Sequence, residues 1–222
     1  MMHVIQKEIL AKLIAADSLR FSQLKPKHLE SNHFMYHLRA LMREGLVEKR
    51  ADGLYSLTTQ GKLYVDQVSL RTLKTRLQPK IVTLVAVQNK AGQWLLYRRK
   101  HQPLIGQVGF PYGKLHLGET VAEAATRELM EKTGLSCKLT HRGDGYIIIN
   151  EGGEPVSQIC FHLFYGRNPT GTLRGETPYG EMFWSDPKTD FSKPPYMVSM
   201  PDLIKQIQKP TKSRFFVELT YK

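Results

Sequence analysis

The strongest constraint on this chain is the segment at residues 113–135, GKLHLGETVAEAATRELMEKTGL, because it contains signals for both ends of a helix. Thr120 and Glu123 have the spacing of a capping box, in which each side chain accepts a hydrogen bond from the other residue's backbone N–H. Gly134 is placed to end the helix, because glycine readily adopts the left-handed conformation found just after a helix. The segment therefore predicts one helix with defined ends.

Three carboxylates lie in or beside this helix. Glu119 precedes it, and Glu128 and Glu131, three residues apart, share one of its faces. Clustered carboxylates repel one another unless a cation neutralises them. One interpretation is a solvated acidic face with an ion pair to Arg127. The other is a site for a hard divalent cation such as Mg²⁺, which prefers oxygen ligands and often bridges to substrate phosphates.

The spacing resembles the signature of the Nudix family, G-x5-E-x7-R-E-U-x-E-E-x-G-U, in which U is aliphatic. Every specified position but one is matched, by Gly113, Glu119, Arg127, Glu128, Leu129, Glu131, Gly134 and Leu135. A fixed frame of this length is far more specific than a lone glycine motif. The exception is Lys132, which stands where the motif has a second glutamate that is usually a metal ligand. A charged lysine has no lone pair to offer a metal, so Lys132 is expected to neutralise Glu128 instead.

The resemblance implies an α/β fold, a Nudix α/β/α sandwich around a mixed sheet. It also implies hydrolysis of a nucleoside diphosphate linked to another group, with Mg²⁺ or Mn²⁺ as the cofactor. In that scheme Glu128 and Glu131 are metal ligands, and Glu119 is a further ligand or orients metal-bound water. Arg127 holds the carboxylates in place. Glu181, shortly before a tryptophan, resembles a late family position that supplies another metal ligand, although an exposed loop carboxylate is an equal alternative.

The segment before the motif supplies candidates for binding the ligand. Residues 81–87 are continuously apolar, as in a buried strand, and WLLYRR at residues 94–99 suits its partner. Arg98 and Arg99 end that hairpin, where the ligand phosphates of a Nudix protein would approach. Gly113 and Lys114 begin the motif and are also predicted to contact the ligand. Nudix proteins commonly have a glycine just before this point, where this chain has Tyr112, which is a second departure from the family pattern. The alternative for the basic residues is a solvated charge cluster. After the motif, strands are expected at residues 138–139 and 146–150, followed by a turn at residues 151–154.

The N-terminal part has a different pattern. Residues 2–16 and 33–44 place apolar side chains at helical spacing, with a shorter helix between them. Alternating residues around Asp52-Gly53 then predict a β-hairpin. Three helices followed by a hairpin resemble a winged helix-turn-helix domain, and residues 58–73 suggest a further helix. We expect this small domain at residues 1–75, a linker at 76–80 and the Nudix domain at 81–222.

The winged-helix resemblance implies that the helix at residues 33–44 reads the major groove of double-stranded DNA, with phosphate contacts from the wing. The candidate DNA-binding residues are His33, Tyr36, His37, Arg39, Arg43, Lys49 and Arg50. The alternative is a winged-helix fold used for protein contact or dimerisation.

Composition agrees with a basic globular protein. The net charge is +12, which suits polyanionic partners such as nucleic acid or nucleotide phosphates. Cys137 and Cys160 have no metal-ligand spacing and are interpreted as reduced thiols. With no signal peptide and no membrane-spanning apolar run, a cytoplasmic protein is expected, and a homodimer because both resembled domain types often pair.

Two functions agree with these features of the sequence. The first is a transcriptional regulator whose Nudix domain binds a nucleotide such as ADP-ribose with weak or absent hydrolysis. The second is an active Mg²⁺-dependent pyrophosphohydrolase tethered to a DNA-binding domain. Lys132 and the fused N-terminal domain favour the regulator. In Nudix-related regulators the Nudix domain usually comes first, whereas the order here is reversed.

Overall fold

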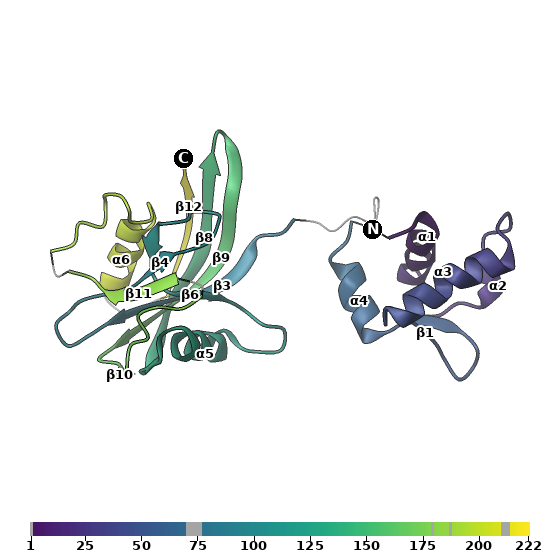
Figure 1. Cartoon of the computed structure of the whole chain (residues 1–222), viewed down its shortest axis with the longest axis horizontal. Helices are drawn as coiled ribbons and strands as arrows, with labels where there is room; N and C mark the ends of the chain where they lie inside the picture. Colours follow the sequence, from purple (N-terminus) through teal and green to yellow (C-terminus); the bar gives the residue numbers. More distant parts are fainter. Residues whose placement is uncertain (1, 70–76, 179, 187, 210–213) are drawn as a thin grey trace. The chain divides into compact units, whose positions relative to one another are not determined.

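The computed structural model describes residues 2–69, 77–178, 180–186, 188–209 and 214–222. The chain divides into two compact units, Met1–Gln78 and Pro79–Lys222, each with its own hydrophobic core (Figure 1). Among the described residues, no helix has the length and apolar character needed to cross a membrane.

The N-terminal unit contains three helices, a short antiparallel hairpin and a fourth helix. In chain order these are α1 (Val4–Ile14), α2 (Phe21–Leu24), α3 (Ser31–Arg43), β1 (Val47–Lys49), β2 (Tyr55–Leu57) and α4 (Thr59–Asp66). The apolar stripe of α3 forms the centre of the core, where Phe34, Leu38 and Leu41 are fully buried. Leu19 makes an isolated antiparallel bridge to Tyr55, which attaches the preceding loop to the hairpin.

The prediction of a helix at residues 58–73 is wrong in its extent. Helix α4 ends at Asp66, because the N–H of Gln67 turns back to the carbonyls of Tyr64 and Val65. Val68 is then buried in a non-helical conformation. Residues 70–73 of the predicted helix and residue 76 of the predicted linker lie outside the described residues.

The C-terminal unit is built on a five-stranded mixed sheet in the order β12-β8-β9-β3-β6. Its strands are β3 (Lys80–Gln88), β6 (Tyr112–Lys114), β8 (Leu139–Glu151), β9 (Glu154–Arg167) and β12 (Phe215–Tyr221). A three-stranded sheet contains β4 (Leu95–Arg99), β5 (Val108–Gly109) and β11 (Gly180–Trp184), and a small pair joins β7 (Leu135–Ser136) to β10 (Thr170–Gly171).

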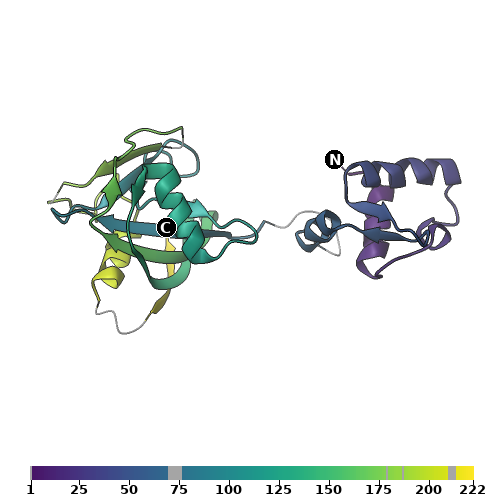
Figure 2. The same cartoon turned by 90° about the horizontal axis from the view of Figure 1, so that it is seen from below.

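Two helices, α5 (Val121–Thr133) and α6 (Met200–Gln208), cover opposite faces of the sheet (Figures 1 and 2). Side chains alternate along β3, so Leu84 packs into the core under α6 and Val85 into the core under α5. The predicted mixed sheet between two helical layers is confirmed.

Strand β8 corrects another expectation. The sequence suggested strands at residues 138–139 and 146–150, whereas Leu139–Glu151 is one long strand paired with β9. The glycine-rich segment that interrupts the apolar pattern remains in the sheet, with a register shift between His141 and Gly143. The predicted turn between β8 and β9 is confirmed, with positive φ angles at Gly152 and Gly153.

Candidate functional site

The helix that carries the carboxylates is capped at both ends as predicted. The Thr120 hydroxyl accepts from the Glu123 N–H at 3.3 Å, and a Glu123 carboxylate oxygen accepts from the Thr120 N–H at 2.8 Å. At the other end Gly134 has φ +71° and donates its N–H to the Met130 carbonyl. These local contacts fix where α5 begins and ends, and therefore where its acidic residues lie.

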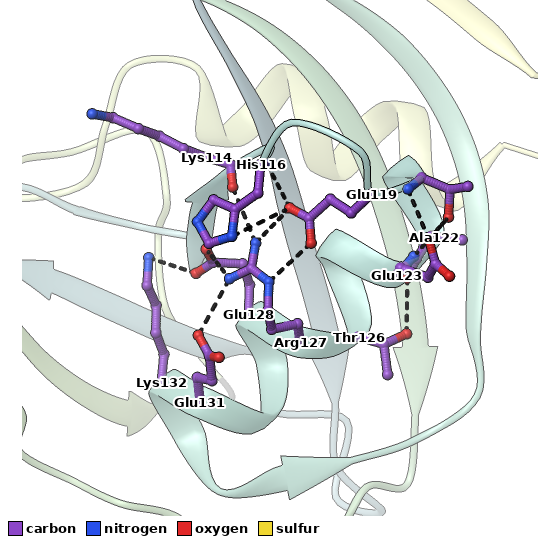
Figure 3. A network of polar contacts seen from close by, with 11 residues as sticks. Lys114, His116, Glu119, Ala122, Glu123, Thr126, Arg127, Glu128, Glu131 and Lys132 are labelled. Carbon is purple, nitrogen blue, oxygen red and sulfur yellow. Dashed lines mark hydrogen bonds and ion pairs between the residues drawn. The ribbon is translucent and has the colours of Figure 1, made fainter. Parts of the chain in front are cut away.

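The three carboxylates of the motif converge on Arg127 (Figure 3). Arg127 Nη2 lies 2.6 Å from Glu119 Oε1, while Nη1 lies 2.9 Å from Glu128 Oε1 and 3.2 Å from Glu131 Oε2. Hydrogen bonds from Arg127 hold the pKa of Glu119 down at about 2, and the same bonds raise the pKa of Arg127. Arg127 thus contacts all three carboxylates, which is the arrangement that its predicted role requires.

Glu128 is the buried member of the group, and it rests directly on Gly113. A Cβ atom added to Gly113 would lie 1.6 Å from the Glu128 carboxyl carbon. Only glycine leaves space for the carboxylate at this point of β6, so the first residue of the motif is required by packing. The Lys114 carbonyl accepts from Arg127 Nη2 at 3.2 Å, while its side chain points away from the cluster (Figure 3).

Lys132 occupies the place of the missing glutamate and joins α5 to β6. Its Nζ lies 3.0 Å from Glu128 Oε2, donates a hydrogen bond to the Tyr112 carbonyl and lies 5.0 Å from the centre of the Tyr112 ring. The expectation that Lys132 neutralises Glu128 therefore matches the geometry. Tyr112 stands immediately before Gly113, so both departures from the family pattern meet in one contact.

The contacts of Glu128 and Glu131 determine whether a divalent cation fits at the carboxylate cluster. Carboxylate oxygens are suitable ligands for Mg²⁺ or Mn²⁺, and Glu131 is well exposed. However, Glu128 Oε1 already faces Arg127, and Glu128 Oε2 already faces Lys132. In the described structure Glu128 Oε2 is buried without a hydrogen bond and has only the Lys132 ammonium as an ion-pair partner, so a divalent ion fits at Glu128 only if it displaces Lys132.

The remaining predicted ligand and metal residues lie apart from the cluster or are paired elsewhere. Glu181 pairs with Arg98 at 3.0 Å across β11 and β4. Arg99 donates to the Pro103 carbonyl at 2.9 Å and to the Tyr112 hydroxyl. Within the described chain, none of the contacts of Glu181 reaches the carboxylates around Arg127.

A largely apolar cavity lies on the α6 side of the sheet, and the sequence did not predict it. Its lining includes Arg99, Phe110, Tyr112, Ile147 and Leu203. These residues come from four strands or loops and one helix, so no local pattern identifies the cavity. The Tyr112 side chain lines it while the Tyr112 carbonyl binds Lys132, which connects the cavity to the carboxylate cluster.

In the N-terminal unit, α3 exposes most of the predicted DNA-binding residues. The side chains of His33, Tyr36, Arg39 and Arg43 are exposed, as are Lys49 and Arg50 in the hairpin region. Arg50 is paired with Asp17 at 3.3 Å and Asp52 at 3.7 Å, so its charge is partly neutralised.

The prediction that His37 faces outward is wrong. His37 is 6 % exposed, its ring stacks on His3 with centroids 4.1 Å apart, and its Nε2 lies 3.3 Å from His33 Nε2. The helical face of α3 at this position turns toward α1, so His37 packs between the helices. Burial, followed by the neighbouring His3 and His33, lowers its pKa.

Comparison with known proteins finds a family model, relatives and solved structures that are similar to this chain. A family model described as "NUDIX domain" matches residues 78–192. An "ADP-ribose pyrophosphatase" of Methanocaldococcus jannaschii is 33% identical over 90 residues, which are 39% of this chain and 53% of that protein. A "Putative 8-oxo-dGTP diphosphatase" of Bacillus subtilis is 33% identical over 104 residues, 46% of this chain and 64% of that protein. The chain thus spans about half to two thirds of these relatives.

Two solved structures show the same fold. A MutT protein from Bacillus halodurans has a TM-score of 0.52 and 24% identity, covering 64% of this chain and 90% of that one. The NUDIX domain of Shewanella oneidensis NrtR, complexed with ADP ribose, has a TM-score of 0.50 and 16% identity, covering 68% of this chain and 98% of that one.

Proposed function

Because this chain belongs to the NUDIX domain family, we propose that its C-terminal unit binds a nucleoside diphosphate derivative such as ADP-ribose with weak or absent hydrolysis. We further propose that its N-terminal unit is a winged helix-turn-helix domain that binds DNA, which makes the protein a ligand-responsive transcriptional regulator. The observation that carries the first part is the Lys132–Glu128 contact of 3.0 Å.

The contact supports binding over turnover for an electrostatic reason. NUDIX hydrolases generally use a divalent metal ion, usually Mg²⁺, to neutralise charge on the phosphates. In this chain the Lys132 ammonium already neutralises Glu128, and it competes with a divalent ion for the same carboxylate. A lysine supplies positive charge for a bound diphosphate but does not activate water as a metal ion does.

The cavity beside Tyr112 supports a nucleoside-type ligand. Its lining is mostly apolar, with aromatic rings from Phe110 and Tyr112 and the cationic Arg99 at one side. Ligand pockets typically combine an apolar lining with a few polar groups that fix orientation. The cavity has a volume of about 70 Å³, well below the roughly 300–1,000 Å³ of typical ligand sites, so we place only an edge of the base in it and the phosphates toward Lys132.

Support for DNA binding comes from the arrangement of the N-terminal unit. Three helices precede a two-stranded hairpin, and α3 exposes Tyr36, Arg39 and Arg43. In a winged helix-turn-helix this helix enters the major groove, where arginine side chains reach bases and phosphates. Use of the same surface for protein contact or for a homodimer is the alternative.

The second candidate function is an active Mg²⁺-dependent pyrophosphohydrolase joined to a DNA-binding unit. The retained Glu119, Glu128 and Glu131 around Arg127 favour it. For this function Lys132 must leave Glu128 when metal and substrate bind.

The experiment that separates the two functions combines turnover and binding. Product formation from ADP-ribose, NAD, dinucleoside polyphosphates and nucleoside triphosphates is measured with Mg²⁺ and with Mn²⁺, and thermal stability is followed in the same samples. Stabilisation by one ligand without turnover supports the binding role. Turnover at ordinary enzyme rates, about 1–1000 s⁻¹, overturns it in favour of the hydrolase.

A further inference from the structure

One row of residues crosses the face of the main sheet on which α5 packs. Gly113 on β6 pairs in register with Thr83 on β3, Thr83 with His162 on β9, and His162 with Asp144 on β8. Residues paired in register place their side chains on the same face of a sheet. Since Glu128 stands over Gly113, the row begins beneath the carboxylate cluster and reaches His162 two strands away, about 10 Å across the sheet.

At its far end the row forms a cluster of two imidazoles and one carboxylate. Asp144 Oδ1 lies 2.8 Å from His141 Nε2 and 2.6 Å from His162 Nδ1. The three side chains are partly exposed, with 14%, 34% and 23% for His141, Asp144 and His162. Their ligand atoms all lie within 4.8 Å of one another, so one ion can contact all three, and solvent can reach it.

A β-bulge brings the three side chains together. His141 and Asp144 are three positions apart in the sequence and would face opposite sides of a regular strand. The register shift between His141 and Gly143 inserts Arg142 as an extra residue and turns His141 onto the Asp144 side. Arg142 is buried and donates to the carbonyls of Ile207 and Lys209 at 2.7 Å and 2.6 Å, which anchors the bulge to the end of α6.

We propose that His141, Asp144 and His162 form a binding site for a transition-metal ion such as Zn²⁺, separate from the carboxylates around Arg127. Imidazole nitrogens suit Zn²⁺ and its neighbours among the transition metals, whereas Mg²⁺ prefers oxygen ligands alone. The ligands are His141 Nε2, His162 Nδ1 and a carboxylate oxygen of Asp144. Three protein ligands leave one tetrahedral position for water or an anionic group.

A hydroxyl group next to the cluster supports a polar ligand at this face. Thr83 pairs in register with His162, is fully buried and has no hydrogen-bond partner for its side-chain oxygen in the described structure. A buried unpaired hydroxyl destabilises a fold unless something satisfies it. Water or an anion held by a metal at the cluster would approach this face of the sheet.

The competing explanation is that Asp144 simply accepts hydrogen bonds from two histidines. That arrangement requires hydrogen on His141 Nε2 and on His162 Nδ1. A metal bound at those atoms requires their lone pairs, so neutral histidines must carry hydrogen on the opposite nitrogens. The two explanations therefore predict opposite tautomers, which NMR distinguishes in the unaltered protein.

The first test is a titration of the ¹⁵N-labelled full-length chain with Zn²⁺ in excess Mg²⁺, which occupies oxygen-only sites. Long-range ¹H–¹⁵N spectra report the tautomer of each imidazole. We expect His141 to change from the Nε2–H to the Nδ1–H form, and His162 to change in the opposite direction. Unchanged tautomers for both residues at the end of the titration overturn the proposal.

The second test uses Co²⁺ as a spectroscopic probe, with competition by Zn²⁺. His162→Gln is expected to weaken Co²⁺ binding at least about tenfold and to remove the visible absorption of the bound ion. His101→Gln, an exposed histidine outside the cluster, and Glu131→Gln, in the carboxylate cluster, are expected to retain both. His33→Gln tests the histidines of the N-terminal unit in the same way.

The variants that lose Co²⁺ absorption show where the ion binds. Loss of the Co²⁺ absorption in Glu131→Gln with retention in His162→Gln places the ion at the carboxylates and overturns the proposal. Loss in His33→Gln alone places it in the N-terminal unit and overturns it as well. If His162→Gln does not fold, the tautomer measurement on the unaltered chain decides.

Discussion

Lys132 and Arg127 hold the Glu128 carboxylate from two sides, at 3.0 Å and 2.9 Å. Both cations are built into α5, so their positions relative to Glu128 are fixed by helix geometry. A divalent ion has to compete with the ammonium group of Lys132 for Glu128 Oε2. Replacing Lys132 therefore removes one of the two positive charges that contact the buried Glu128 carboxylate.

Lys132→Glu is expected to raise Mg²⁺-dependent turnover of the best substrate by about tenfold or more. The change restores the carboxylate of the motif and removes the ammonium from Glu128, and a tenfold gain corresponds to about 1.4 kcal/mol of transition-state stabilisation. Initial rates with and without Mg²⁺ measure it. Lys132→Gln is the matched control, because it removes the positive charge without adding a carboxylate. Equal rates for the glutamate variant and the unaltered protein would contradict the idea that Lys132 limits catalysis.

Gly113→Ala is expected to destabilise the C-terminal unit by about 1–3 kcal/mol, the usual range for overpacking. The new Cβ would lie 1.6 Å from the Glu128 carboxyl carbon, so Glu128 must move. Gly175→Ala is the matched control, because the nearest atom outside its own chain neighbours lies 3.8 Å away. Urea unfolding of both variants measures the difference. A Gly113→Ala protein as stable as the control would show that Glu128 does not pack on β6.

At the scale of single elements, α3 combines an exposed basic face with a buried histidine. His37 lies between α1 and α3, where burial and two neighbouring histidines lower its pKa. The unfolded chain then binds a proton at higher pH than the folded unit does. The stability that neutral His37 contributes to the N-terminal unit is therefore fully present above about pH 6.5 and is lost as the pH falls through the lowered pKa of His37.

We expect a lower urea midpoint for the N-terminal unit at about pH 5.5 than at about pH 7.5, measured as the part of the helical circular dichroism change that is not accompanied by a change in tryptophan fluorescence. His37→Gln should reduce this difference, because glutamine does not titrate. His28→Gln, an exposed histidine of the same unit, should leave it unchanged. An identical pH dependence in the two variants would refute the assignment to His37.

The exposed face of α3 carries the second prediction at this scale. Arg39→Ala combined with Arg43→Ala is expected to weaken binding to duplex DNA. If each arginine contacts one phosphate, the slope of log affinity against log salt concentration should fall by about two. Lys90→Ala combined with Lys188→Ala removes the same charge from exposed positions of the other unit and serves as the control. Equal affinities for the two double variants would favour the protein-contact role of α3.

The elements differ in how far the sequence predicted them. Helix α5 was predicted closely, because its caps, Thr120 and Gly134, act through hydrogen bonds within a few residues. The long strand β8 was predicted in two pieces, because its glycines weaken a local strand pattern that pairing with β9 overrides. The cluster of His141, Asp144 and His162 was missed, because it depends on a bulge and on a contact between two strands. His37 was placed outside for a related reason: helical spacing alone did not show that α1 packs against it.

At the scale of the whole molecule, the two units have separate hydrophobic cores, and a spectroscopic signal specific to one unit distinguishes them. The two tryptophans, Trp94 and Trp184, both belong to the C-terminal unit. Tryptophan fluorescence therefore follows unfolding of that unit alone, whereas helical circular dichroism follows both units. Each ligand can thus be assigned to the unit that it stabilises.

If the protein is a regulator, the two ligands must affect each other. ADP-ribose at 100 times its dissociation constant should stabilise the fluorescence transition by about 2.7 kcal/mol, and duplex DNA should stabilise the circular dichroism transition of the N-terminal unit. With both present, the gains should depart from additivity by about 1–3 kcal/mol, because coupling between two sites is reciprocal. Titration of DNA with and without ADP-ribose measures the same coupling as a change in DNA affinity. Strict additivity in both measurements would mean that the units bind their ligands independently, since a ligand with equal affinity for the DNA-free and DNA-bound states shifts neither.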